Sequence, residues 1–349
     1  MKQESRHVII VTLFCAGIYF LSLAGQQGTN NNRQTDLEGL SVSNLTKPNT
    51  NLVIKLEHCQ CSRTIQRNSR NLETNFSQTT CGRDAYQRGS NQKVVSFSFY
   101  GNPESKQHRK RKYFEGINEN LQEMLDLYGE DWIMRLYIDF ETSDSMLGKL
   151  CHLACRNNNI DLCFARDLPG TPVRDAADLF PMLWRFFPSL DPQVDILLSR
   201  DLDSLIGQRE VSAVTEWLQS GKLLHSMRDH PQHSIPILGG TWGARLTSSK
   251  ARQKWQKSWK MILKHKMAHS PRNATGPDQK LLQHGVWPLF QQDSLQHDSY
   301  SCKTFADSVG FPTKRTGEKK GNFIGGGHLF WEECPVRCRR KGHQDWKYC

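Results

Sequence analysis

The sequence predicts an α/β fold with a mostly parallel sheet flanked by helices, and three observations lead to this prediction. Apolar, strand-like segments alternate with segments of helical period from Lys93 onward. This alternation is typical of crossover units that build a parallel sheet. The chain has 349 residues, 37% of them hydrophobic, which is enough for one large domain or two small ones with appendages. Finally, Pro192–Gly207 reads as a buried strand followed by a turn that carries two carboxylates.

The first half of this alternation is regular. A strand from Lys93 to Phe99 ends at the turn signal Tyr100–Pro103, because glycine and proline interrupt regular structure there. Further helices and strands follow from apolar residues at helical spacing and from short apolar runs. The expected helices are Tyr113–Tyr128 and Met146–Arg156, and the expected strands are Trp132–Phe140 and Ile160–Phe164.

The second half continues the pattern around the strand Val194–Leu198. An aromatic helix is expected before this strand, and a helix that ends at Gly221 is expected after it. The glycine-rich segment Gly239–Gly243 is expected either to let backbone approach a ligand or to form a tight packing turn. The remaining expected elements are the helices Phe180–Phe187, Arg209–Ser220, Lys250–Lys266 and Gln279–Gly285, and the strand Leu223–Met227.

The amino-terminal segment predicts entry into the secretory pathway. Val8–Ala24 is uncharged and apolar, at the short end of the roughly 17–25 residues that span a bilayer. Lys2 and Arg6 precede it, as the positive-inside rule expects of a cytoplasmic flank. We therefore expect a cytoplasmic tail over residues 1–7 and a signal anchor over residues 8–25. A cleaved signal peptide, and hence secretion, is the alternative, because Ser22 and Ala24 resemble a cleavage site.

Two further features agree with a luminal location. Of the 11 cysteines, Cys15 lies in the apolar run, which leaves an even number for disulfides. Zinc bound by Cys334 and Cys338 is the competing interpretation for two of them. Acceptor sequences for N-glycosylation begin at Asn44, Asn75 and Asn273.

The polar segment over residues 26–92 has no sustained apolar period, so we expect a mostly extended stem there, part of which the cluster of Cys59, Cys61 and Cys81 could pin locally. The folded domain is then expected to occupy residues 93–349. The formal net charge of the chain is +11, which suits acidic partners such as nucleotide phosphates or anionic glycans. The secretory topology disfavours a nucleic-acid partner.

The carboxylates of Asp201 and Asp203 form the most informative pair in the chain. They follow an apolar strand, and open α/β sheets bind ligands at the carboxyl ends of their strands. Carboxylate oxygens suit Mg²⁺ or Mn²⁺, which commonly takes one or two protein carboxylates together with substrate phosphates. The ordinary alternative is that Asp201 caps the next helix.

With these features together, the chain resembles Golgi-type glycosyltransferases of the GT-A fold. The stretch Ser199–Arg245 is similar to the core of a sparsely characterised group of glycosyltransferase-like proteins. The blocks PDQKLL at Pro277–Leu282 and QHDSYSC at Gln296–Cys302 are similar to later blocks of that group. The resemblance covers roughly residues 93–311 and implies no particular sugar.

The resemblance implies a divalent metal, Mn²⁺ or Mg²⁺, at the acidic pair. Asp203 would bind the metal directly, and Asp201 would contact the metal, its water or the ribose. A late histidine often completes such a site, and His297 is the first candidate, with His328 as the second. A structural histidine in a hydrogen-bonded turn is an equally good interpretation of His297.

The other candidate site residues follow from their positions. Arg200 could contact a diphosphate or only neutralise the two aspartates, and Gly239 and Gly240 could lie against the donor. His230, after another expected strand, could touch donor or acceptor.

If the reaction inverts the anomeric centre, a carboxylate must accept the proton of the acceptor. Asp278 and Asp229 are the candidates for this base. A helix N-cap is the ordinary alternative for Asp278.

The sequence therefore predicts a metal-dependent glycosyltransferase, a single-pass type II protein of the Golgi membrane with a luminal catalytic domain. It would transfer a sugar from a nucleotide-sugar donor to a glycan or glycoprotein, and it would be held to the membrane through Val8–Ala24. The alternative is a non-catalytic luminal protein that binds glycans and keeps the same fold.

Overall fold

A computed structural model describes residues 50–68, 75–102, 104–105, 112–141, 144–316, 323–326 and 330–349. These residues belong to one compact unit that extends from Lys47 to Cys349. Within the described ranges, no helix is both long and apolar enough to cross a bilayer. The expected anchor Val8–Ala24 lies outside the described residues, as do Asn44 and His328.

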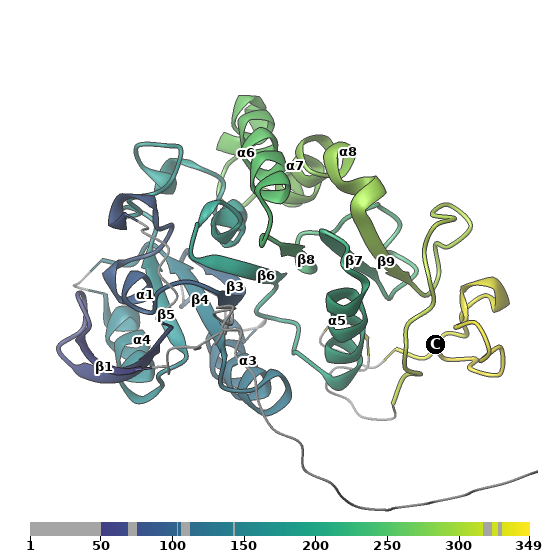
Figure 1. Cartoon of the computed structure of the whole chain (residues 1–349), viewed down its shortest axis with the longest axis horizontal. Helices are drawn as coiled ribbons and strands as arrows, with labels where there is room; N and C mark the ends of the chain where they lie inside the picture. The colour runs from purple at the N-terminus through teal and green to yellow at the C-terminus, as the bar shows by residue number, and fades with distance from the viewer. Residues whose placement is uncertain are drawn as a thin grey trace, which may run out of the picture. The chain divides into compact units, whose positions relative to one another are not determined.

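A seven-stranded sheet forms the centre of this unit (Figure 1). Its strand order is β5-β4-β3-β6-β8-β7-β9. Strand β8 is antiparallel to both of its neighbours, and the other pairings are parallel. The prediction of a mostly parallel α/β sheet is therefore confirmed. The strands are β3 (Gln92–Phe99), β4 (Trp132–Ile138), β5 (Ile160–Phe164), β6 (Val194–Arg200), β7 (Leu224–Arg228), β8 (Thr241–Arg245) and β9 (Ser294–Asp298).

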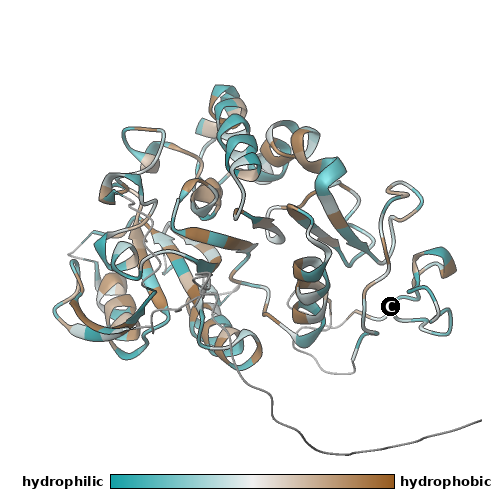
Figure 2. Cartoon of the chain, in the orientation of Figure 1, coloured by the Kyte–Doolittle hydropathy of each residue, from teal (hydrophilic) through white to brown (hydrophobic). Residues whose placement is uncertain are grey.

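Helices cover both faces of the sheet because successive strand residues point to opposite sides. In β6, Leu197 packs into one hydrophobic core, and Ile196 and Leu198 pack into the other. Figure 2 shows β6 as a largely hydrophobic strand between the two layers. The layer that packs with Leu197 holds η3 (Pro181–Leu190), α6 (Ser249–Lys264), α7 (Pro277–Gly285) and α8 (Trp287–Phe290), and the other holds α3 (Tyr113–Tyr128), α4 (Ser145–Arg156) and α5 (Gln208–Ser220).

The order of the strands fixes where a ligand can bind. The chain runs outward from β3 through β4 to β5 and then returns to place β6 on the other side of β3. In open α/β sheets, ligands bind outside the carboxyl ends of the strands where the order reverses in this way. The carboxyl ends of β3 and β6, followed by Tyr100 and Asp201, are therefore the expected binding edge.

Part of the segment that the sequence assigned to a stem belongs to the folded domain. The hairpin of β1 (Thr50–Lys55) and β2 (Ser62–Arg67) is joined to α4 by the disulfides Cys59–Cys151 and Cys61–Cys155. The short helices η1 (Phe76–Gln78) and α1 (Arg83–Gln87) follow, and Cys81–Cys163 links this region to β5. The folded region therefore begins well before Lys93, because disulfides supply attachment that composition alone did not indicate.

Disulfides also fix the carboxyl-terminal segment. Cys302 pairs with Cys338, and Cys334 pairs with Cys349. All ten cysteines outside the apolar run are thus paired, as their even number predicted. A zinc site at Cys334 and Cys338 is excluded, because each sulfur is already bonded to another cysteine.

Three elements differ from the sequence prediction. The aromatic segment around Phe180–Phe187 is a 3₁₀ helix, η3, rather than an α-helix, and it includes Pro188. Strands β8 and β9 were not expected, because neither TWGAR nor SLQHD contains an apolar run. Their pairing with longer neighbours, rather than local pattern, defines them as strands.

We predict that Asp161→Asn will destabilise the domain by about 3–5 kcal/mol in urea unfolding. Asp161 is fully buried on β5 and accepts hydrogen bonds from Arg63 at 2.7 Å and from Arg88 at 2.8 Å, so its loss leaves two buried cations poorly paired. As a control, Asp131→Asn breaks an exposed pair with Lys93 and should cost less than about 1 kcal/mol. Equal effects for the two variants would contradict this interpretation.

Candidate active site

The antiparallel strand β8 brings a glycine pair to the binding edge. Arg200 at the end of β6 pairs with Thr241 at the start of β8, so Asp201 and Gly240 lie side by side. A Cβ atom on Gly240 would lie only 1.9 Å from Oδ2 of Asp201. Glycine is therefore required at this position for the carboxylate to keep its place.

A buried guanidinium joins the two carboxylates of this site. Arg185 on η3 donates from its Nη1 atom to Oδ1 of Asp201, and from its Nη2 atom to Oδ2 of Asp278 at 2.9 Å. The Arg185 side chain is only 2% exposed, whereas that of Asp201 is 33% exposed. The cluster is therefore fixed from the protein side and open to solvent at Asp201.

Asp278 reaches the cluster from the first turn of α7. A Cβ on Gly239 would lie 2.1 Å from Oδ2 of Asp278, so the glycine pair packs against both carboxylates. Burial raises the pKa of Asp278, and the Arg185 guanidinium opposes that shift. A buried carboxylate of raised pKa is a stronger proton acceptor than an exposed one, as general base catalysis requires.

Tyr100 follows β3 and completes this side of the edge. Burial raises the pKa of Tyr100 to about 12, so its hydroxyl stays protonated at neutral pH. The charges of Arg185, Asp278 and Asp201 also act on it, which places the tyrosine in the same electrostatic environment as the cluster. The site thus combines carboxylates, one guanidinium and an aromatic hydroxyl at the reversal point of the sheet.

The structure corrects the expectation for Arg200. Its side chain is buried and donates to Oε1 of Glu210 at 2.7 Å, and also to the carbonyl of Trp242 at 2.8 Å. Its guanidinium therefore forms hydrogen bonds with residues of α5 and β8, and it does not face the binding edge. Arg185 holds the place at Asp201 that the sequence assigned to Arg200.

Asp229 is also corrected, because it cannot act as a base. Its carboxylate is fully buried, and Arg209 and Arg315 both donate to it at 2.8 Å. Ser299 and the backbone N–H of Ile324 also donate to it. These cations lower the pKa of Asp229 to about 2 against the effect of burial. Asp229 is a structural anchor of the carboxyl-terminal segment.

His297 lies away from the acidic pair. It belongs to β9 and is fully buried, with Nδ1 2.8 Å from Nε2 of His225 and Nε2 3.3 Å from Glu216. Both ring nitrogens are therefore occupied, and the histidine cannot supply a lone pair to a metal at Asp201. Among the residues that the structure describes, no group of three or more His, Cys, Asp or Glu side chains could hold a metal ion.

A divalent cation still fits the pair Asp201 and Asp203 if substrate supplies the remaining ligands. Asp203 lies half-buried in the turn after β6. Asp201 has a partly exposed carboxylate beside the open backbone of Gly240. Mg²⁺ commonly binds through one or two carboxylates together with phosphate oxygens. Their carboxylate oxygens are of the kind that such a cation prefers, and the described part of the chain provides no group of three His, Cys, Asp or Glu ligands.

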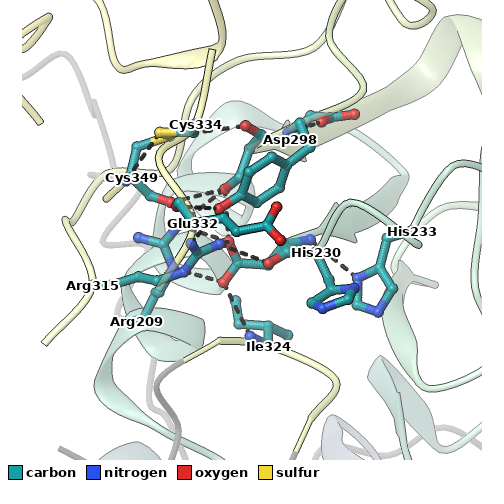
Figure 3. Close-up of polar contacts among 12 residues, drawn as sticks. Arg209, His230, His233, Asp298, Arg315, Ile324, Glu332, Cys334 and Cys349 are labelled. Carbon is teal, nitrogen blue, oxygen red and sulfur yellow. Dashed lines mark hydrogen bonds and ion pairs between the residues drawn. A yellow bond between two sulfur atoms is a disulfide. The ribbon is translucent and has the colours of Figure 1, made fainter. Parts of the chain in front are cut away.

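His230 lies in the turn after β7, beside the site rather than in the cluster. Its ring is 4.3 Å from that of Phe330 and 5.1 Å from that of Phe323, both from the carboxyl-terminal segment. Figure 3 shows His230 next to His233, which the sequence analysis did not single out. The two histidine rings are 5.6 Å apart, and Nδ1 of His233 accepts a hydrogen bond from the backbone N–H of Asp229.

Sequence reasoning also missed Arg185, although a signal for it was present. The residue interrupts the run LWRFF, in which its neighbours are apolar and buried. An arginine within a buried segment requires buried carboxylate partners. That rule predicts the existence of partners, but only the fold shows that they are Asp201 and Asp278.

No family model and no curated protein match the chain. Similar solved structures include TarS of S. aureus, at 12% identity and a TM-score of 0.32 over 54% of this chain. The chain spans about half, 53%, of that structure. The galactosyltransferase LgtC, in complex with donor and acceptor sugar analogs, has 14% identity and a TM-score of 0.33, over 59% of this chain and 73% of LgtC. The mannosyltransferase Ktr4p of S. cerevisiae has 11% identity and a TM-score of 0.32, over 76% of this chain and 83% of Ktr4p. Since these TM-scores are below 0.5, no residue role is transferred from these proteins.

The lowered pKa of Asp229 predicts a loss of stability in acid. The carboxylate contributes fully above its ordinary pKa of 3.8, and the contribution falls as pH drops from 3.8 toward 2. The shift corresponds to about 2 kcal/mol of unfolding free energy. Urea unfolding between pH 5 and pH 2 should show a shallower pH dependence for Asp229→Asn than for the unsubstituted protein. Identical slopes would contradict the prediction.

Proposed function

We propose that this protein is a GT-A-type glycosyltransferase that takes a nucleotide-sugar donor at the carboxyl edge of β3 and β6. One observation carries the proposal: Arg185 joins Asp201 to Asp278, and the backbone of Gly239 and Gly240 packs against both carboxylates at this edge. Such an arrangement offers a solvent-facing carboxylate beside a buried one. An inverting sugar transfer can use such a pair, with one carboxylate for the cation and donor and the other as the base for the acceptor.

Asp201 and Asp203 would hold a divalent cation, Mn²⁺ or Mg²⁺, together with the donor diphosphate. The physical reason is charge, because a diphosphate next to two carboxylates is repelled unless a cation lies between them. The cation would act there as a Lewis acid that stabilises the leaving diphosphate. Arg185 fixes the carboxylate of Asp201 in position and is not itself free to bind phosphate, since its two Nη atoms already donate to Asp201 and Asp278.

Asp278 would accept the proton of the acceptor hydroxyl, which corresponds to an inverting transfer. Two observations favour it over Asp229, namely its raised pKa and its place in the cluster. Asp229 is excluded from this role by its two arginine partners. The acceptor would be a glycan or glycoprotein, and the net charge of +11 suits an anionic one.

The location we propose is the Golgi lumen, with Val8–Ala24 as a signal anchor. Five disulfides among the described residues support an oxidising compartment, because such bonds are rare in the cytosol. The Golgi is preferred over secretion because the apolar run has the length and the basic flank of an anchor.

The test is a screen of the purified full-length chain with UDP-, GDP- and CMP-sugars and Mn²⁺, with release of the nucleotide as the measurement. We expect turnover of one donor, which chelation of the metal abolishes. Asp278→Asn should lower kcat by about 10²–10⁴-fold, since it removes the base. Asp293→Asn is the matched control, because this carboxylate pairs only with Lys250 and Lys254 on the surface among its described contacts. Glycan binding without any donor turnover would instead support the non-catalytic alternative.

A second prediction concerns the glycine pair. Gly240→Ala places a methyl group 1.9 Å from Oδ2 of Asp201, so the carboxylate must move. A displacement of this size can lower activity by about 100-fold without unfolding the protein. Gly148→Ala is the control, since no atom lies within 4 Å of its added Cβ. Full activity of Gly240→Ala would show that Asp201 need not keep its observed position.

A further inference from the structure

The turn after β7 is anchored to the carboxyl-terminal segment through Asp229 (Figure 3). Asp229 accepts hydrogen bonds from Arg315 at 2.8 Å and from the backbone N–H of Ile324 at 3.0 Å. Ser299 donates both to Asp229, at 2.6 Å, and to the carbonyl of the last residue, Cys349, at 3.0 Å. Cys349 and this turn are therefore joined through one hydrogen-bond network.

His233 lies in the same turn, and its contacts determine which ring nitrogen carries the proton. The backbone N–H of Asp229 donates to Nδ1 of His233 at 3.2 Å. Nδ1 therefore carries the lone pair, and in the neutral ring the proton must reside on Nε2. Burial lowers the pKa of His233 to about 4, so the ring is neutral at physiological pH. His233 thus presents a permanent N–H donor.

The remaining contacts place His233 on the side of the binding edge. Gly325 lies between Thr241 and His233, since its added Cβ would be 2.9 Å from the former and 3.1 Å from the latter. Thr241 directly follows Gly240, which packs on Asp201. The charge of Asp201 also acts on His233. His233 therefore lies near Asp201, with Gly325 packed between its ring and Thr241.

We propose that the Nε2–H group of His233 binds a phosphate oxygen of the nucleotide donor, in the same site as the cation that Asp201 and Asp203 would hold. This inference rests on the proposed function and adds a binding residue to the same site. A neutral N–H donor suits this position because it stabilises an anionic oxygen without repelling the cation. Because Nε2 carries the proton, His233 serves as a hydrogen-bond donor and not as a metal ligand.

The experiment measures binding of UDP, GDP and CMP to the full-length protein in the presence of Mn²⁺ by titration calorimetry. His233→Ala should weaken binding by about 10- to 100-fold, as expected for a lost hydrogen bond to a charged group. His233→Gln, which keeps an N–H donor on a side chain of similar reach, should bind within about threefold of the unsubstituted protein on the same grounds. His284→Ala is the matched control, because this histidine stacks on His265 at the last turn of α7, whereas Asp278 lies in the first turn.

Two outcomes separate this inference from the proposed function. If no nucleotide binds to the unsubstituted protein, the proposed function fails and the inference fails with it. If a nucleotide binds equally well to His233→Ala, only the role of His233 is overturned.

Nitrogen NMR of the unsubstituted protein gives an independent test that needs no folded variant. We expect the His233 signal of a neutral ring protonated at Nε2. A ring protonated at Nδ1 would overturn the inference.

Discussion

The ion pairs of Arg185 are the interaction on which the candidate site depends. A guanidinium buried in the layer over the sheet needs carboxylate partners, and it finds one after β6 and one on α7. These partners are 77 residues apart in sequence, from Asp201 to Asp278. The same guanidinium that makes the burial of Asp278 tolerable also ties it to Asp201. Arg185 therefore both stabilises the fold and positions the two carboxylates of the candidate site.

The parallel core of the fold could be predicted from sequence because its strands and helices have strong local patterns. Helix Tyr113–Tyr128 and strand Ile160–Phe164 have the expected bounds. Strand β8 could not be predicted, since Thr241–Arg245 has a glycine in its middle and becomes a strand only by pairing with β6. The domain begins before the boundary expected at Lys93. The polar composition of the preceding hairpin did not indicate that disulfides join it to α4.

The candidate site was predictable in its acidic residues but not in its cations or histidines. Asp201 and Asp278 were found because each occupies a recognisable local position, the end of a strand and the start of a helix. Arg200 and Asp229 have equally suggestive positions. However, Arg200 forms an ion pair with Glu210, and Asp229 forms ion pairs with two arginines. Sequence gives the position of a residue along the chain, whereas its partners depend on which elements pack together. His233 could not be selected from sequence, because its environment includes Gly325 of the distant carboxyl-terminal segment.

The cross-links between the early hairpin and α4 carry a practical consequence for anyone who produces this protein. A shortened chain that starts at Lys93 would retain Cys151, Cys155 and Cys163 but lack all three of their partners. Three orphaned thiols would then be exposed to mispairing or intermolecular bridging during export. A recombinant fragment should accordingly keep every residue from Lys47, where the compact unit begins.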